Sequence, residues 1–294
     1  MKNIDQRRRF IFDQADIRGE VVTLNESYRE VLVNNDLPAP LRPVLGQFLA
    51  AVTLLSSTLK FDGRLTIQAR GEGPISILMA ECSKQCEVRA IARLSEGVDL
   101  STLDTSKLSS LLGEAVLAIT IEPKGGERYQ GIVPIDADTL AECLEHYFRQ
   151  SEQLETRIWL AADNFTCAGL LVQALPRQIS DSETAYQDCW ETAVHLAETV
   201  KSQEMLALDQ QQLLFRLFHE LQVRVFDSQS IVFACSCSRD RSANALKSAG
   251  EEEVKAMLAE SPVIQIDCQF CNQQYEFTEA DLPDLFPDTH QTLH

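Results

Sequence analysis

The sequence lacks the motifs of several large protein classes. Its 294 residues contain no P-loop and no glycine-rich nucleotide fingerprint, so nothing in the chain points to nucleotide chemistry. Internal repeats and low-complexity segments are also missing. The five histidines (His146, His195, His219, His290 and His294) show no metal-ligand spacing. With 45% apolar residues, the chain is long enough for two domains, or for one large domain with a small satellite.

Basic residues are scarce. The chain has 26 lysines and arginines against 44 acidic residues, which gives a net charge of −18. A negative field of this size repels nucleic acid and anionic membrane surfaces. We therefore expect neither a nucleic acid nor a membrane as a partner.

Long apolar runs are scarce too. The most apolar helical stretch, residues 45–59, is too short to span a bilayer and carries Gln47 and several hydroxyl groups. The first twenty residues hold a basic cluster, but no apolar run of signal-peptide length follows it. We expect a cytoplasmic protein, in which thiols stay reduced and structural disulfides are not formed.

Cysteine, in contrast, is abundant, with nine residues. Five are scattered, namely Cys82, Cys86, Cys143, Cys167 and Cys189. The other four, Cys235, Cys237, Cys268 and Cys271, form two close pairs near the C-terminus. In a reducing compartment such a cluster indicates metal binding or redox chemistry rather than a disulfide framework.

The pattern of the chain predicts an α+β fold. Residues 1–178 read as a domain of mainly antiparallel sheet packed with helices, because short turns separate alternating segments such as "GRLTIQAR" (63–70). Helical spacing appears within 36–60 and over 136–150. Further strands are predicted in "GPISILMA", "EVRAIARL", "AVLAITIEP", "RYQGIVPI", "TRIWLAA" and "CAGLLVQALP".

Two further parts follow. Residues 179–230 form a helical linker region, with Asp209 as a candidate N-cap and an apolar stripe made by Leu213, Leu214, Leu217, Phe218 and Leu221. This stripe must pack on the first domain or on another chain. Residues 231–294 form a small C-terminal domain with four basic and eleven acidic residues. A domain this small is usually marginal without a metal or a disulfide.

The spacing of the clustered cysteines suits zinc. Cys268 and Cys271 form a C-x-x-C knuckle, and Cys235 and Cys237 form a tighter C-x-C pair, with 30 residues between the two pairs. Three interpretations remain open from spacing alone: buried free thiols, a structural zinc site, or a redox site. A C-x-C disulfide departs from relaxed geometry, and strained disulfides are the labile kind. Arg239 and Arg241 either favour the thiolates or simply begin a solvated helix.

The motifs "CSCSRDRSANALKSAGEEEV" and "CQFCNQQYEF" resemble the zinc-binding end of the 33-kilodalton heat-shock protein family of redox-regulated chaperones. The resemblance extends along the whole chain through "RGEVVTL", "TLKFDGRLTIQARGEGPISIL", "GERYQGIVPI", "YFRQSEQLETR" and "AGLLVQALP". Glu155 stands where the family commonly has proline. Cys82 and Cys86 look additional to the family pattern; we expect surface thiols or a side reaction under oxidation, and assign them no role.

The resemblance implies an ATP-independent holdase chaperone, not an enzyme. In its reduced form Cys235, Cys237, Cys268 and Cys271 would bind one Zn²⁺ per chain. Oxidation would form the disulfides Cys235–Cys237 and Cys268–Cys271, release zinc, unfold the small domain and loosen the linker region. The active form would be a homodimer that binds unfolded or oxidatively damaged client proteins, and the reduced form a monomer.

Two other functions compete with this interpretation. A zinc-ribbon nucleic-acid binder would use the same knuckle, but the C-terminal domain is acidic where a basic patch is needed. A thiol–disulfide oxidoreductase would place its C-x-x-C at a helix N-terminus after a strand, whereas Cys268 and Cys271 lie between two predicted strands.

Overall fold

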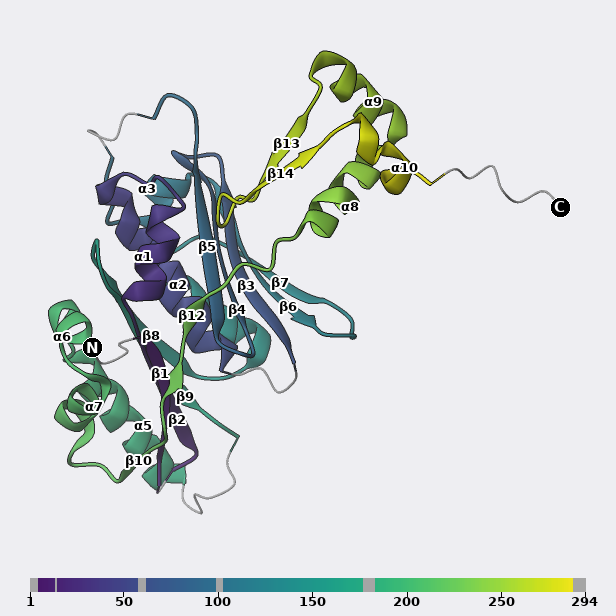
Figure 1. The fold of residues 1–294 in the computed structure, drawn as a ribbon. Helices are drawn as coiled ribbons and strands as arrows, with labels where there is room; N and C mark the ends of the chain where they lie inside the picture. Colours follow the sequence, from purple (N-terminus) through teal and green to yellow (C-terminus); the bar gives the residue numbers. More distant parts are fainter. Residues whose placement is uncertain (1–4, 14, 58–61, 99–102, 177–182, 288–294) are drawn as a thin grey trace. The chain divides into compact units, whose positions relative to one another are not determined.

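The computed structural model describes residues 5–13, 15–57, 62–98, 103–176 and 183–287. The chain separates into two compact units, Met1–Ala234 and Cys235–His294, and each is described here by itself. Both helices and sheets are present, as the α+β prediction requires (Figure 1). The predicted boundary at residue 178 falls outside the described residues, so the three-part division remains a prediction.

The first sheet of the larger unit combines both ends of that unit. Its order is β10-β1-β2-β9-β8, and β11 also pairs with β1. All of its pairings are antiparallel. The strands are β1 (Gln6–Phe12), β2 (Ile17–Leu24), β8 (Thr156–Ala162), β9 (Cys167–Ala174), β10 (Val223–Val225) and β11 (Gln229–Ser230). β9 is buried along its whole length, which is typical of a strand covered on both faces.

The second sheet has the order β12-β5-β4-β3-β6-β7. Five of its strands were predicted from alternation, and each pairs antiparallel with its neighbours. The sixth, β12, pairs parallel to β5. The strands are β3 (Gly63–Gly71), β4 (Ile75–Ser83), β5 (Glu87–Leu94), β6 (Ala115–Pro123), β7 (Tyr129–Pro134) and β12 (Val232–Phe233).

The helix α2 (Arg42–Ser56) forms the centre of the larger unit. It contacts strands of both sheets, and nearly all of its residues are buried. Together with the preceding 3-10 turn η1 (Ala39–Leu41) it makes an apolar helix of 18 residues, long enough by length and composition alone to cross a membrane. However, 72% of that stretch is buried inside the protein, as is expected of the core helix of a globular domain.

Three helices cover the other face of the first sheet: α5 (Glu183–Glu198), α6 (Ser202–Ala207) and α7 (Gln210–Phe218). Asp209 caps α7 as predicted, because its carboxylate accepts a hydrogen bond from the Gln212 backbone N–H at 2.9 Å. The predicted stripe packs on the first domain, where the Phe218 ring lies 5.6 Å from that of Phe10 and 5.3 Å from that of Phe12.

The remaining elements of the larger unit border these layers. The helix α4 matches the helix predicted over 136–150 and begins with a capping box between Thr139 and Glu142. These remaining elements are α1 (Glu26–Val33), α3 (Leu108–Leu112), α4 (Leu140–Tyr147) and the π-helical turn η3 (Phe148–Glu152).

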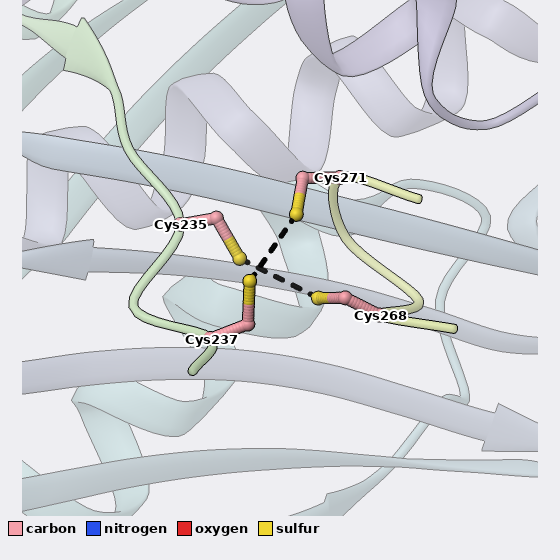
Figure 2. A group of neighbouring side chains, drawn as sticks. All are labelled: Cys235, Cys237, Cys268 and Cys271. Carbon is pink, nitrogen blue, oxygen red and sulfur yellow. Dashed lines mark hydrogen bonds between the residues drawn. The ribbon is translucent and has the colours of Figure 1, made fainter. Parts of the chain in front are cut away.

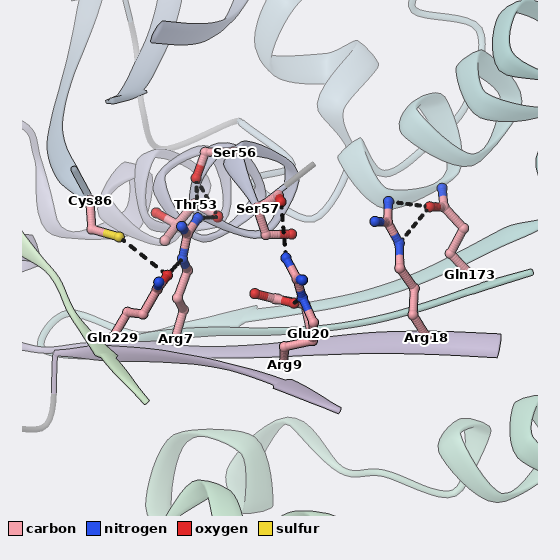
Figure 3. A network of polar contacts seen from close by, with 10 residues as sticks. All are labelled: Arg7, Arg9, Arg18, Glu20, Thr53, Ser56, Ser57, Cys86, Gln173 and Gln229. Carbon is pink, nitrogen blue, oxygen red and sulfur yellow. Dashed lines mark hydrogen bonds and ion pairs between the residues drawn. The ribbon is translucent and has the colours of Figure 1, made fainter. Parts of the chain in front are cut away.

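A buried polar network joins the first sheet to the end of α2 (Figure 3). Arg7 is only 3% exposed. Its guanidinium donates to the Ser56 hydroxyl at 2.6 Å and to the Thr53 carbonyl oxygen at 3.4 Å, so it satisfies groups at the helix C-terminus. Its Nε donates to Gln229 Oε1 at 2.8 Å, which ties β11 to the same place.

The smaller unit has few buried residues. Its fully buried core is Leu246, Val254, Phe277 and Leu285. Ser238 caps its first helix and Gly250 ends it. The elements are α8 (Arg239–Ala249), α9 (Glu251–Glu260), the hairpin β13 (Ile264–Asp267) and β14 (Gln274–Phe277), the turn η4 (Glu279–Asp281) and α10 (Leu282–Leu285).

The packing of α7 generates the first prediction. Phe218→Ala should lower the free energy of unfolding of the larger unit by about 3–5 kcal/mol, because the ring is buried between two others. Urea unfolding followed by tryptophan fluorescence measures this, since Trp159 and Trp190 both border the same cluster. The control is Phe215→Ala on the same helix, 72% exposed, which should change stability by under about 0.5 kcal/mol. Equal effects in both variants would contradict the packing.

Candidate metal centre

Two short segments of the smaller unit supply the four clustered cysteines. Cys235 and Cys237 lie directly before α8, and Cys237 is followed by the cap residue Ser238. Cys268 and Cys271 lie in the turn between β13 and β14. The C-x-x-C pair is thus in a hairpin turn, as expected, and not at the start of a helix.

Local backbone geometry brings the second pair together. The Asn272 N–H donates to the Cys268 carbonyl oxygen at 2.8 Å, and the Cys268 N–H donates to the Gln273 carbonyl oxygen at 2.9 Å. Asn272 has a φ of 56°, in the left-handed region that asparagine tolerates better than most residues. The chain therefore reverses within a few residues, and both sulfur atoms face the same side.

The four sulfur atoms point toward one another (Figure 2). All lie within 4.8 Å of each other. The Sγ of Cys235 is 3.5 Å from that of Cys268, and the Sγ of Cys237 is 3.4 Å from that of Cys271. A tetrahedron with Zn–S bonds of about 2.3 Å has S–S edges of about 3.8 Å. The donor set and its spacing therefore fit one zinc ion, with small shifts of the side chains.

The thiols of this cluster differ in acidity. Burial opposes ionisation of Cys235, but hydrogen bonds from the Cys237 backbone and from the neighbouring thiols lower its pKa to about 7. Burial raises the pKa of Cys268 and of Cys271. The positive end of the α8 dipole lies just after Cys237 and favours negative charge there. Cys235 is thus the thiol with the lowered pKa in this cluster, and the thiolate is both the metal ligand and the nucleophile of cysteine chemistry.

Tyr275 was not found from the sequence. Its hydroxyl donates to the Sγ of Cys237 at 3.2 Å, and this hydrogen bond raises the pKa of the Tyr275 hydroxyl to about 12. Its ring packs against the small core. The strand register pairs Tyr275 with Ile266, two residues before Cys268, and so places Tyr275 beside the cysteine cluster. This register is not visible in the local sequence. A hydrogen bond to a ligand sulfur orients that ligand and stabilises its charge.

The two arginines at the start of α8 have other partners. Arg239 donates to Asp281 Oδ1 at 2.9 Å and to the Glu276 carbonyl oxygen at 3.0 Å, and its guanidinium lies 4.4 Å from the centre of the Phe277 ring. Arg241 donates to the Ser236 hydroxyl at 2.7 Å. Arg239 therefore fastens α8 to β14 and η4, and the largest influences lowering the pKa of Cys235 are hydrogen bonds.

The five scattered cysteines belong to the larger unit and are free thiols. Burial raises the pKa of each one, to about 12 for Cys82. The expectation that Cys82 and Cys86 are surface thiols is wrong, because they are 0% and 5% exposed. They lie where β4 turns into β5, against the main core, which the local sequence does not reveal.

Comparison with known proteins is consistent over the whole chain. A family model described as "Hsp33 protein" matches residues 5–278. The "33 kDa chaperonin" of Ectopseudomonas mendocina is 49% identical over 286 residues, covering 96% of this chain and 95% of that protein. The protein of the same name from Pseudomonas aeruginosa strain LESB58 is 47% identical over 290 residues, covering 97% and 96%.

A solved structure has the same fold. It is the 33 kDa chaperonin, or heat shock protein 33 homolog, of Thermotoga maritima. The TM-score is 0.80, and the alignment covers 96% of this chain and 97% of the other at 23% identity. At this identity the likeness is one of fold.

Removal of one thiol tests the metal centre. The reduced protein should contain one zinc ion per chain. Cys268→Ser should weaken zinc binding by more than about 100-fold, because substitution of a residue that merely hydrogen-bonds to a ligand already lowers metal affinity by about 10–100-fold. Competition with a chromophoric chelator and elemental analysis measure both quantities. Cys189→Ser, in the larger unit, is the matched control and should bind zinc normally. Zinc-free reduced protein, or equal affinities in the two variants, would contradict the assignment.

The hydroxyl of Tyr275 can be tested separately. Tyr275→Phe keeps the ring and removes the hydrogen bond to Cys237, so zinc affinity should fall by about tenfold while the small unit still folds. The same chelator competition measures the affinity, and the charge-transfer band of the cobalt-substituted protein should shift. Tyr129→Phe, on β7 of the other unit, should change neither. An unchanged cobalt spectrum in Tyr275→Phe would show that the contact does not tune the centre.

Proposed function

The chain belongs to the Hsp33 protein family of chaperones, and on that premise we propose that it is an ATP-independent holdase activated by oxidation. In this proposal the reduced protein holds one Zn²⁺ ion and is inactive. Oxidation releases the ion, and the activated protein keeps unfolding or oxidatively damaged proteins from aggregating. It acts by binding and not as an enzyme.

The observation that carries the proposal is the cluster of four thiols in a unit with a very small core. In the described part of this unit, residues 235–287, four apolar side chains form the buried core, whereas the larger unit has two extensive clusters. Zinc binding supplies about 10–16 kcal/mol in small structural sites, and a folded domain has only about 5–15 kcal/mol of net stability. Loss of the ion would therefore unfold this unit and leave the other folded.

Cys235, Cys237, Cys268 and Cys271 are both the zinc ligands and the redox-active residues of the proposal. Each disulfide forms when two thiolates lose two electrons to a peroxide, whose O–O bond breaks to give two hydroxide ions. Following the family resemblance, the disulfides are Cys235–Cys237 and Cys268–Cys271. The shortest sulfur distances join the two pairs instead, at 3.4 Å and 3.5 Å, but all four sulfurs lie within 4.8 Å, so both pairings are within reach.

The proposed effect on the rest of the chain follows the predicted division into residues 1–178, 179–230 and 231–294. The first part binds clients and dimerises, the second is the linker region, and the third is the redox switch. The linker helices α5–α7 cover Phe10, Phe12 and their neighbours. Loosening them would expose an apolar surface that an aggregating client can bind.

The partners in the proposal are unfolded clients and, after oxidation, a second copy of the chain, while the reduced protein is a monomer. The net charge of −18 disfavours nucleic acid and membranes. A cytoplasmic location suits thiols that are reduced until stress oxidises them.

Light scattering of a heat-denatured client tests the proposal. The reduced zinc-loaded protein should not prevent aggregation, whereas protein treated with peroxide under mild heat should suppress it without nucleotide and lose activity on reduction with zinc. Mass spectrometry of unreduced digests checks the disulfides, and a zinc-sensitive dye checks release of the ion. Suppression that is equal before and after peroxide, or zinc retained in the active form, would overturn the redox mechanism.

A further inference from the structure

Short segments of the chain cover the side of β5 that faces away from β4. β5 has β4 on one side, and β12 and the end of α1 on the other. An edge strand presents a row of backbone groups that another chain can pair with, and proteins normally cover such edges. Along this edge, backbone groups of Cys86, which directly precedes β5, and of Val88, Ala90 and Ala92 in β5 have hydrogen-bond partners from two separate parts of the chain.

The side-chain amide of Asn35 covers the half of the edge formed by Ala90 and Ala92. Asn35, which is buried near the end of α1, donates through Nδ2 to the Ala90 carbonyl oxygen at 3.0 Å. Its Oδ1 accepts from the Ala92 N–H at 2.9 Å. The amide thus takes the place of a neighbouring strand. Its own Nδ2 also bonds the Val31 carbonyl oxygen at 2.8 Å, so it is fixed to the body of the unit.

In the part of the chain that the structure describes, the segment Ser230–Ala234, which contains β12, covers the other half of the edge. The Val232 N–H donates to the Cys86 carbonyl oxygen, and the Ala234 N–H to the Val88 carbonyl oxygen, both at 3.1 Å. The pairing is two residues long and parallel. Strands this short contribute little stability of their own.

Backbone and side chains hold the start of this segment: Ser230 pairs with Gln6 of β1, the Ile231 N–H donates to the Asp5 carbonyl oxygen at 2.9 Å, and Phe233 packs against the main core. Ile231 is 1% exposed and belongs to the main core, whereas Val232 is 50% exposed. The segment is also held just before Ser230 by Gln229. The Gln229 Oε1 atom accepts a hydrogen bond from Arg7 Nε at 2.8 Å and lies 3.8 Å from the Cys86 Sγ atom (Figure 3). After Ala234 the next residue is Cys235, a member of the thiol cluster.

We propose that the edge formed by Cys86 and Val88, with the core site now filled by Ile231, binds one extended segment of an unfolded polypeptide by strand addition. Ser230–Ala234 holds this place until the smaller unit loses its thiol cluster and with it the fold that follows Ala234. The inference rests on the proposed function and adds, to the apolar surface under α5–α7, a second place where a client binds, in an extended conformation.

The chemistry of the edge fits that partner. Two carbonyl oxygens accept from any backbone N–H, so recognition does not depend on the client's sequence. The Ile231 site is apolar and takes one aliphatic side chain, while the next position faces solvent. Exposed, extended and partly aliphatic segments are what an unfolded chain offers and a folded protein hides. The Asn35 amide limits the docked segment to a few residues.

A peptide with the sequence of Ser228–Ala234, made soluble by terminal lysines, is the direct probe. It should bind the oxidised full-length protein and displace a fluorescent unfolded client, and it should not bind the reduced zinc-loaded protein. The same peptide with Ile231→Asp should compete at least about tenfold less well, because it places a carboxylate in an apolar site.

Two full-length variants complete the test. Ile231→Asp should suppress client aggregation in the reduced state while zinc is retained, since it releases the segment without oxidation. Val232→Asp, whose side chain points outward, should stay inactive until oxidised. Amide exchange at residues 232 and 234 checks that the segment is released only in the first variant.

The outcomes separate the two proposals. If oxidised wild-type protein binds no client, the proposed function fails, and the edge is then judged by direct binding of the peptide alone. If oxidised protein holds clients but the Ser228–Ala234 peptide neither binds nor competes, strand addition at β5 is wrong. The same conclusion follows if Ile231→Asp folds, releases the segment and stays inactive with zinc bound.

Discussion

Contacts between four sulfur atoms hold the smaller unit closed. They join the start of α8 to the β13–β14 turn across 30 intervening residues. Arg239 fastens α8 to β14, and Tyr275 connects the sulfur of Cys237 to the core. The thiol cluster and these two contacts together hold the start of α8 against the hairpin, beside a core of four buried apolar side chains in the described part of this unit.

The larger unit is built on a different physical basis. Its stability comes from layers, with α2 packed between two sheets and α5–α7 on the outer face of the first sheet. Four of its five cysteines are buried and Cys189 is half-buried, and burial raises the pKa of all five thiols, which leaves little thiolate. In the smaller unit, by contrast, hydrogen bonds lower the pKa of Cys235 to about 7.

The sequence was sufficient for much of this arrangement. Alternation revealed β3 to β9, helical spacing revealed α2, α4 and α7, and cysteine spacing identified the four thiols. β1 was missed because "QRRRFIF" reads as a basic surface, whereas Arg7 is buried against the end of α2 by contacts with residues nearly fifty positions away. Cys82, Cys86 and Tyr275 were misjudged or missed for a similar reason. Their surroundings come from strand register and packing, which a local pattern does not contain.

The junction between Ala234 and Cys235 has a mechanical consequence. The last residue bonded to the β5 edge and the first residue of the thiol cluster share one peptide bond, so their Cα atoms are about 3.8 Å apart. No residue lies between them, so a displacement of Cys235 has to be taken up by the backbone dihedral angles of these two residues or passed on to β12. If a few flexible residues were inserted here, Cys235 could move while Ala234 stayed hydrogen-bonded to the Val88 carbonyl oxygen. The direct link between Ala234 and Cys235 therefore matters as much as the β12 hydrogen bonds before it and the thiol cluster after it.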